Sequence, residues 1–286
     1  MKVFSRKSFS VRRGFTLVEV LIAVAITALL SALLVSITAE VLRIWSRSSN
    51  TLTTNSQARI ALDIVERDLQ SAIFRADGRQ WFASGTAPGG WDPAPPEVDV
   101  FRLNGQPLRN DYLAFFSAGP EGISTVLYRL IAQPLVPGGT QEFFQLVRTE
   151  LSARHTLRTR FDLAGTVWSA AFPFGLEEMI LKGAIDNDDY TGEVGNPEAL
   201  VITRDIIATN VIGFRADLFP SATEPREIEV ELVVLSNDGW QGVNVLLDGR
   251  RLPPPGETLE QAVENLLRRE AFVYRKVIYP HFEIVP

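Results

Sequence analysis

The feature that most constrains this chain is an uncharged stretch near its N-terminus. Val20 to Ala39 contains no charged residue, and as a helix it would be about 30 Å long, the hydrocarbon thickness of a bilayer. One carboxylate, Glu19, lies just inside the apolar run that begins at Phe15. An ionisable group there costs a few kcal/mol unless it has a partner. The sequence therefore predicts a membrane span with a functional carboxylate at its start.

Positive charge is concentrated before the span. Five cations precede it, and only Arg43 and Arg47 follow it closely; the five are Lys2, Arg6, Lys7, Arg12 and Arg13. The positive-inside rule then places the N-terminus in the cytoplasm and everything after Ala39 outside. A cleaved secretory signal peptide is the competing interpretation, but its apolar core would be about 7–15 residues long and followed by a small-residue cleavage site. Residues 36–40 make a poor site of that kind.

The residues around Glu19 form a recognisable pattern. Gly14 precedes Phe15-Thr16-Leu17-Val18-Glu19, which resembles the type IV prepilin signature. The resemblance implies that a prepilin peptidase cuts after Gly14 and methylates the new amine of Phe15. It also implies that Glu19 pairs with the Phe15 amine of a neighbouring subunit in a helical filament. A plain signal anchor gives no reason for this pattern at the membrane edge.

The helix is expected to continue well beyond the span. No Gly or Pro occurs between Phe15 and Asp77, so one helix over 15–76 would be about 90 Å long. Any bend is expected in 46–57, a stretch rich in Ser, Thr and Asn. We expect 15–39 to be the membrane and filament-core half and 40–76 an amphipathic half that packs on a soluble domain. The apolar stripe of that half consists of Ala58, Ala61, Leu62, Val65, Leu69, Ala72 and Ile73.

Small residues recur every four positions in the span, as Ala28, Ala32 and Ser36 and as Thr27 and Ser31. This spacing lets helices approach closely in lipid. Ordinary transmembrane composition is rich in the same residues, so the spacing by itself is weak evidence for helix association.

The remainder of the chain is dominated by strand signals. Together with the long helix they predict an α+β fold, in which antiparallel sheet packs on the helix stripe. Residues 77–97 are expected to form a loop, in which Trp81 and Trp91 either contact a partner or hold the loop on the domain. A capping box at Thr258 predicts a short helix. The expected strands are 98–103, 112–118, 125–131, 143–148, 200–207, 211–219, 228–235 and 272–279.

A second resemblance concerns the body of the chain. The helix sequence over 58–72 is similar to that of minor pseudopilin J and of PilW-like minor pilins, and the strand sequences 113–115, 126–130 and 146–148 resemble those of the J-type pseudopilin body. The resemblance implies a pilin-like fold, with 1–14 as leader peptide and 77–286 as an extracytoplasmic β-rich domain. Relative to that family, we expect insertions at 77–97, 181–198 and 237–270.

Charge and composition exclude several classes of function. Removal of the leader takes the formal charge from −6 to −11, which argues against nucleic acid or anionic lipid as the main partner. The absence of cysteine excludes disulfides and a lipidated cysteine. The sequence contains neither a P-loop nor a dinucleotide-binding glycine motif, and its two histidines, His155 and His281, lack zinc-site spacing. We therefore expect no cofactor and no enzymatic activity.

Two charged clusters have alternative interpretations. Asp186, Asp188 and Asp189 could hold calcium, but the EF-hand positions for Gly and Glu are occupied by Thr191 and Pro197. A solvated acidic turn is the simpler interpretation. A basic stretch could hold an acidic partner or nucleic acid, or could be a charged strand face and turn; its members are Arg148, Arg154, Arg158 and Arg160.

The sequence therefore predicts a single-pass inner-membrane protein with a periplasmic domain, drawn into a filament on assembly. The resemblances imply a minor pseudopilin of a type II secretion system. Its expected partners are prepilin peptidase, other pseudopilins or minor pilins, and the inner-membrane assembly platform. A minor pilin of a type IV pilus is the first alternative. A membrane-tethered periplasmic enzyme or binding domain is the second.

Overall fold

The computed structural model describes residues 16–74, 81–86, 101–119, 122–134, 142–151, 202–221 and 225–280. It divides into two compact units, residues 1–49 and 50–286, and each is described by itself. Helix α1, Leu17–Gln70, contributes residues to both. The helix is unbroken through 46–57, the stretch in which the sequence predicts any bend.

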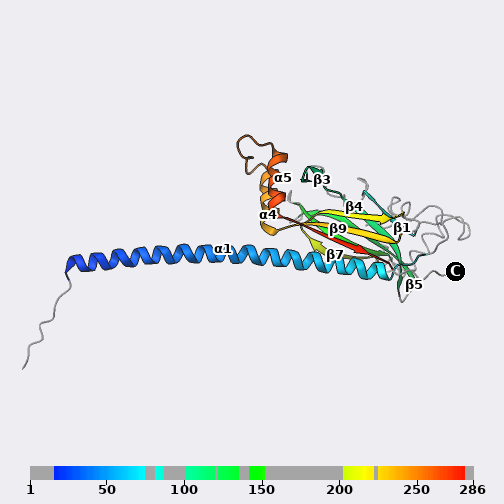
Figure 1. Ribbon diagram of the computed structural model, residues 1–286, viewed down its shortest axis with the longest axis horizontal. Coiled ribbons are helices and arrows are strands. Elements are labelled where there is room, and N and C mark those ends of the chain that lie inside the picture. The colour runs from blue at the N-terminus through cyan, green and yellow to red at the C-terminus, as the bar shows by residue number, and fades with distance from the viewer. Residues whose placement is uncertain are drawn as a thin grey trace, which may run out of the picture. The chain divides into compact units, whose positions relative to one another are not determined.

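The second unit contains two antiparallel sheets and a short hairpin (Figure 1). The larger sheet has the order β1-β4-β5-β6-β7, and the smaller one has the order β10-β9-β8. The hairpin β2–β3 turns at Asn104-Gly105, both with positive φ, as a two-residue hairpin requires. The bounds are β1 Phe82–Thr86, β2 Arg102–Leu103, β3 Gln106–Pro107, β4 Asp111–Gly119, β5 Gly122–Pro134, β6 Glu142–Leu151, β7 Ile202–Thr209, β8 Val211–Phe219, β9 Glu227–Leu235 and β10 Ala271–Ile278.

The predicted α+β class is confirmed, and strands β4 to β10 confirm the predicted strands from 112–118 onward. The loop predicted over 77–97 is wrong in part, because 82–86 is strand β1 and pairs with β4. Trp81 is buried and meets the ring of Phe116 edge-on. This burial contradicts a partner-contact role for Trp81 and confirms the alternative that it packs on the domain. Trp91 lies outside the described residues.

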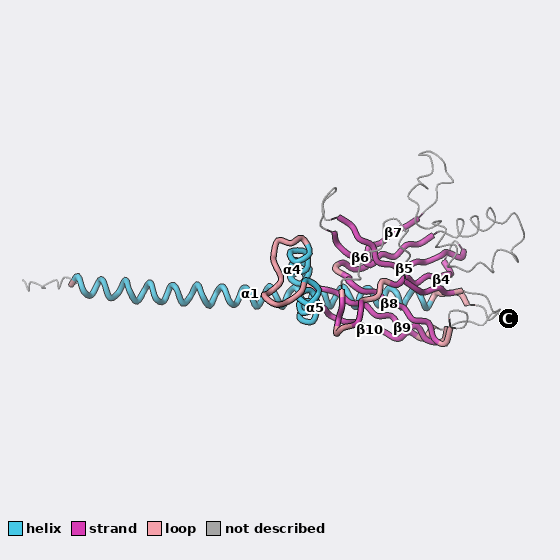
Figure 2. The backbone as a smooth tube through the Cα atoms, turned by 90° about the horizontal axis from the view of Figure 1, so that it is seen from above, coloured by secondary structure: helices cyan, strands magenta, loops and turns pink. Residues whose placement is uncertain are grey.

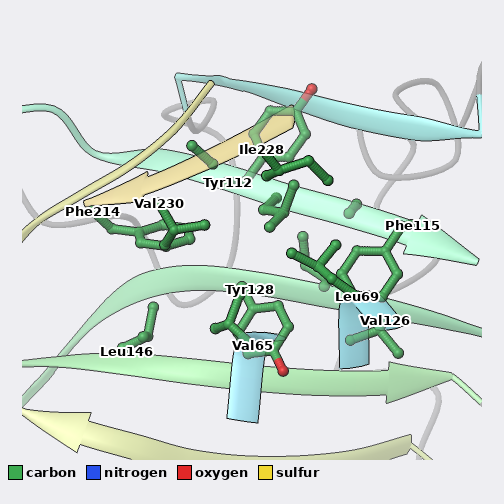
Figure 3. Packing of buried hydrophobic residues seen from close by; sticks show 14 of the residues in the cluster. Val65, Leu69, Tyr112, Phe115, Val126, Tyr128, Leu146, Phe214, Ile228 and Val230 are labelled. Atoms are coloured by element: carbon green, nitrogen blue, oxygen red, sulfur yellow. The ribbon is translucent and has the colours of Figure 1, made fainter. Parts of the chain in front are cut away.

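The apolar stripe of α1 packs into the main core of the second unit. Within this core, Val65 and Leu69 point toward Tyr128, Phe115 and Val126 of the larger sheet (Figure 3). The smaller sheet contributes alternate residues of β9 to the same core. The buried stripe residues are Ala58, Ala61, Leu62, Val65 and Leu69, as the 3.6-residue period predicts. The apolar stripe of α1 therefore packs against residues of both sheets, while the opposite face of the helix is exposed.

Helix α1 ends at Gln70, earlier than the predicted end near residue 76. Ser71 accepts a hydrogen bond from the amide of Ala118 at 3.0 Å, and the amide of Ile73 donates to the carbonyl of Phe116 at 2.8 Å. Ala72 forms an antiparallel bridge with Ser117. The chain leaves the helix because pairing with β4 takes over its backbone hydrogen bonds. Nothing local in the sequence enforces this end.

Polar contacts attach α1 to the larger sheet along one flank. Asp68 accepts a hydrogen bond from the hydroxyl of Tyr128 and another from Nε of Arg148, the latter at 2.5 Å. Burial and the charge of Asp68 raise the pKa of the Tyr128 hydroxyl. Burial disfavours the charged form of Arg148, but the contacts with Asp68 and Glu150 outweigh that effect and raise the pKa of the guanidinium. The cluster is therefore a charged pair with a neutral phenol donor.

On the opposite flank, Lys276 of β10 bridges two acids of α1. Its Nζ lies 2.7 Å from Asp63 Oδ1 and 2.7 Å from Glu66 Oε2. The hydrogen bond and charge of Lys276 lower the pKa of Asp63, and the same bonds raise the pKa of Lys276. The bridge therefore stabilises the fold from above the unfolded pKa of aspartate, about 3.9, to below that of lysine, about 10.4.

We expect Asp63→Asn to reduce the loss of unfolding free energy that the protein shows as the pH falls into the acid range. As pH falls through the lowered pKa of Asp63, the wild type loses the contribution of this carboxylate, and the variant has none to lose. Urea unfolding of the full chain in detergent at neutral and acid pH measures the difference. Identical losses of unfolding free energy on acidification in both proteins would contradict the assignment.

A second, smaller core lies beneath two helices, α4 Asn237–Leu247 and α5 Leu259–Glu270, at one end of the sheets (Figure 2). The predicted capping box of α5 is confirmed at Thr258 and Gln261. Helix α4 was not predicted. Its Gly239 lies where a Cβ would come within 2.6 Å of Cβ of Glu270, so close approach requires glycine there. The residues of this core are Phe101, Phe144, Ile212, Val233, Leu235, Trp240, Val243, Leu246, Ala262, Val263 and Leu267.

Candidate assembly segment of the N-terminal helix

The first turn of α1 positions the one acid of the span. The amide of Glu19 donates to Oγ1 of Thr16 at 3.3 Å, and the amide of Val20 donates to the carbonyl of Thr16 at 3.2 Å. Thr16 thus caps the helix, and Glu19 lies three residues later, where a negative charge interacts favourably with the helix dipole. Sequence reasoning missed this cap, although the Thr-x-x-Glu spacing signals it.

The apolar residues after Glu19 are exposed within their own unit. Leu21, for example, is 63% exposed and Leu34 is 67% exposed. α1 is the one helix in the described part of the chain that is long and apolar enough to cross a membrane. Two hydroxyls in this stretch bond to their own helix, Thr27 to the carbonyl of Ala23 and Thr38 to that of Leu34, both at 2.8 Å. Hydroxyls bonded in this way carry no unsatisfied donor into lipid.

One face of this part of α1 carries small side chains and has the carboxylate of Glu19 at its N-terminal end. Glu19 and the small side chains one, two and three turns later line a shallow groove along the helix; its lining is Glu19, Val20, Ala23, Val24, Thr27, Ala28 and Ser31. Small residues at a four-residue spacing let a second helix approach closely. The structure therefore places Glu19 on the same face as the residues suited to close helix packing.

Some of the predicted site residues lie among the residues that the structure describes, and others do not. Glu19 lies in the first turn of α1, whereas Gly14 and Phe15 fall outside the described residues. Arg148, the first residue of the predicted basic stretch, is a structural ion-pair partner of Asp68 and Glu150, which supports the interpretation as a strand face. Among the described residues no group of His, Cys, Asp and Glu could hold a metal ion. Asp186, Asp188, Asp189, His155, His281, Arg154, Arg158 and Arg160 all lie outside them.

Comparison with known proteins identifies the N-terminal segment. Residues 10–35 match the model of the prokaryotic N-terminal methylation motif. This segment is type IV prepilin-like. The match spans Gly14, Phe15, Glu19 and the small-residue face of α1. No curated protein and no solved structure matched the chain.

The prepilin-like segment accounts for the features of the N-terminal unit. A methylation motif implies processing by a prepilin peptidase and assembly with other pilin-like subunits. The apolar helix behind it is consistent with a single-pass membrane anchor. The α+β arrangement of the second unit, with the stripe of α1 packed against antiparallel sheets, is consistent with a pilin-like fold.

Proposed function

We propose that this protein is a minor pseudopilin, a structural subunit of a type II secretion pseudopilus that assembles through its N-terminal helix. The observation that carries the proposal is the methylation motif, whose carboxylate, Glu19, lies on the small-residue face of α1 at the start of the exposed, uncharged stretch 20–39. In this proposal 1–14 is the leader, 15–39 forms the filament core, and the domain from residue 50 onward makes the outer contacts.

The mechanism follows from the cost of placing charge in lipid. Cleavage after Gly14 creates an amine on Phe15, and Glu19 of the neighbouring subunit pairs with it. Each group then has an oppositely charged partner in the filament, and this pairing is favourable because an unpaired carboxylate at the membrane edge costs a few kcal/mol. Pairing therefore favours the subunit position that aligns amine and carboxylate, while the groove beside Glu19 admits the neighbouring helix.

The mature N-terminus provides the direct test of processing. Intact mass and terminal-peptide mass spectrometry are compared between cells with and without the prepilin peptidase. We expect a chain that begins at N-methylated Phe15 and that is lost with the peptidase. A chain that begins at Met1 in both strains would overturn the proposal and leave a membrane-tethered domain.

Gly14 offers a graded test of the same step. We expect Gly14→Ala to be cleaved and Gly14→Leu to remain unprocessed, because a peptidase pocket built for glycine has no room for a branched side chain. The ratio of cleaved to uncleaved chain on a denaturing gel measures the effect. Equal processing of both variants would show that the residue before the cut is not selected by size.

A minor pilin of a type IV pilus remains the alternative, because the motif serves both machines. It differs in the filament that the subunit joins and not in the chemistry of assembly. To separate the two functions, the secretion pseudopilus genes and the pilus genes are deleted in turn. The deletion after which the processed protein stays in the inner membrane identifies the filament that the subunit joins.

A further inference from the structure

The connection between α4 and α5, residues 248–258 and called here the α4–α5 loop, presents apolar side chains to solvent. Leu252 is 81% exposed, and Leu247 and Leu259 at the adjoining helix ends are 42% and 41% exposed. Exposed leucines are common one at a time. In this loop Leu252 is followed by Pro253, Pro254 and Pro255, so four residues in a row are apolar.

The exposure of Leu252 belongs to an ordered loop. The amide of Gly249 donates to the carbonyl of Leu246 at 3.2 Å, and the amide of Arg251 donates to that of Val245 at 3.1 Å. On the other side, the amide of Glu257 donates to the carbonyl of Pro254 at 3.0 Å. The three prolines restrict the backbone further and bring no N–H group that would need a partner away from water.

The loop belongs to the end of the second unit at which the chain enters. Tyr274 donates a hydrogen bond to Asn55, and Lys276 pairs with Asp63, so β10 runs toward higher-numbered residues of α1. Helix α5 ends where β10 begins, at Ala271, and therefore lies toward the low-numbered end of the α1 residues in this unit. Figure 2 shows α4 and α5 together at one end of the sheets.

A short helical segment joins the uncharged stretch to the first residue of the second unit. Asn50, the first residue of the unit, follows the end of the uncharged stretch at Ala39 by eleven residues. Because these residues are helical, they separate the two points by at most about 16 Å, whatever the orientation of the unit. The headgroup layer adds about 5–8 Å on that side of a bilayer. Asn50, where the unit begins, is therefore held at most about 11 Å beyond the headgroup layer.

The loop carries groups that can bind headgroup phosphates. Residues 248–258 contain two arginines, Arg250 and Arg251, and two acids, Asp248 and Glu257, and Asp248 lies 3.6 Å from Arg250. Guanidinium groups bind phosphate oxygens, which every phospholipid carries, while leucines beside them enter the acyl boundary. The acidity of the whole body opposes a broad contact with anionic lipid, so the contact is confined to this loop.

We propose that the α4–α5 loop is a membrane-contact site, in which Leu252 inserts into the phospholipid interface and Arg250 and Arg251 bind headgroup phosphates before assembly. This inference rests on the membrane anchor of the proposed function but not on filament formation. The loop is then a second lipid contact besides the span, and extraction of the subunit into a filament includes its release from the membrane.

The absence of cysteine makes the test direct. The full chain with Leu252→Cys carries a polarity-sensitive fluorophore and is reconstituted in phosphatidylcholine–phosphatidylglycerol vesicles, with or without a spin-labelled lipid. We expect a blue-shifted emission that the spin-labelled lipid quenches. Ser221→Cys is the matched control. Ser221 is exposed and follows β8 at the end of the sheet away from α4 and α5, so a fluorophore there should stay unquenched. Arg250→Ala with Arg251→Ala should weaken quenching at position 252.

Each other outcome overturns the inference. If the fluorophore at position 252 has the same emission as the fluorophore at position 221, the loop lies in water and does not contact the membrane. A blue shift that grows with protein density and is insensitive to the lipid quencher shows contact between copies of the chain. Extraction of the protein from the vesicles by carbonate shows that it is not anchored, which overturns the membrane anchor as well. Loss of the loop contact in an anchored chain leaves the proposed function intact.

Discussion

Replacing Glu19 with alanine is expected to abolish incorporation into a filament while leaving membrane insertion and the folded domain unchanged. The methyl side chain suits lipid better than a carboxylate does, so insertion is not impaired. The neighbouring Phe15 amine, however, is left without a partner in a low-dielectric environment. Removing one member of such a pair costs about 3 kcal/mol, which corresponds to roughly a hundredfold loss of incorporation at equilibrium.

The measurement is the fraction of processed protein in sheared or cross-linked filaments relative to that in the inner membrane. Glu40→Ala is the matched control, because Glu40 is an acid of the same helix whose partner, Arg43, lies within its own chain at 3.0 Å. Glu19→Gln keeps the size and removes the charge, and we expect it to fail as Glu19→Ala does. Normal incorporation of either Glu19 variant would refute the assigned role.

The second large effect concerns the attachment of α1 to the sheet. We expect Asp68→Ala to lower the free energy of unfolding by about 3 kcal/mol, because the variant leaves the guanidinium of Arg148 and the hydroxyl of Tyr128 without their common acceptor in a mostly buried site. Chemical denaturation of the full chain in detergent, followed by tryptophan fluorescence, measures the change.

Asp63→Ala is the control for this prediction, because Asp63 is an exposed acid of the same helix and its loss should cost much less. Combining Asp68→Ala with Tyr128→Phe should cost less than the sum of the two single changes, since the second change removes the donor that the first leaves unpaired. Equal costs for Asp68→Ala and Asp63→Ala would contradict the buried cluster.

Patterns that are local in sequence were predicted correctly. The stripe from Ala58 to Leu69 follows from helix periodicity, and strands such as β9 follow from alternation. Such patterns can be predicted because neighbouring residues determine which face of an element is apolar. The helix boundary at Gln70 could not be predicted, since it depends on hydrogen bonds to β4, whose partner residues are distant in sequence.

The elements that were missed have weak local signals. Strand β1 consists of Phe-Ala-Ser-Gly-Thr, and its pairing with β4 makes it a strand. Helix α4 contains Gly239 and Gly242, both unfavourable in a helix. It forms because Ser236 caps it and because Trp240 and Val243 are buried beneath it. Burial of these side chains offsets a poor intrinsic propensity, and glycine at 239 is required by the approach of Glu270.

By itself the sequence predicted a single-pass membrane anchor, because hydrophobic length, charge asymmetry and the carboxylate at the edge of the apolar stretch are all properties of contiguous residues. Only the tertiary structure decided how the domain is held together and what it presents. Asp68 meets Tyr128 and Arg148 across sixty and eighty positions, and the α4–α5 loop lies at the anchored end because of where α5 joins β10. Contacts over such separations depend on the fold, and no local pattern encodes them.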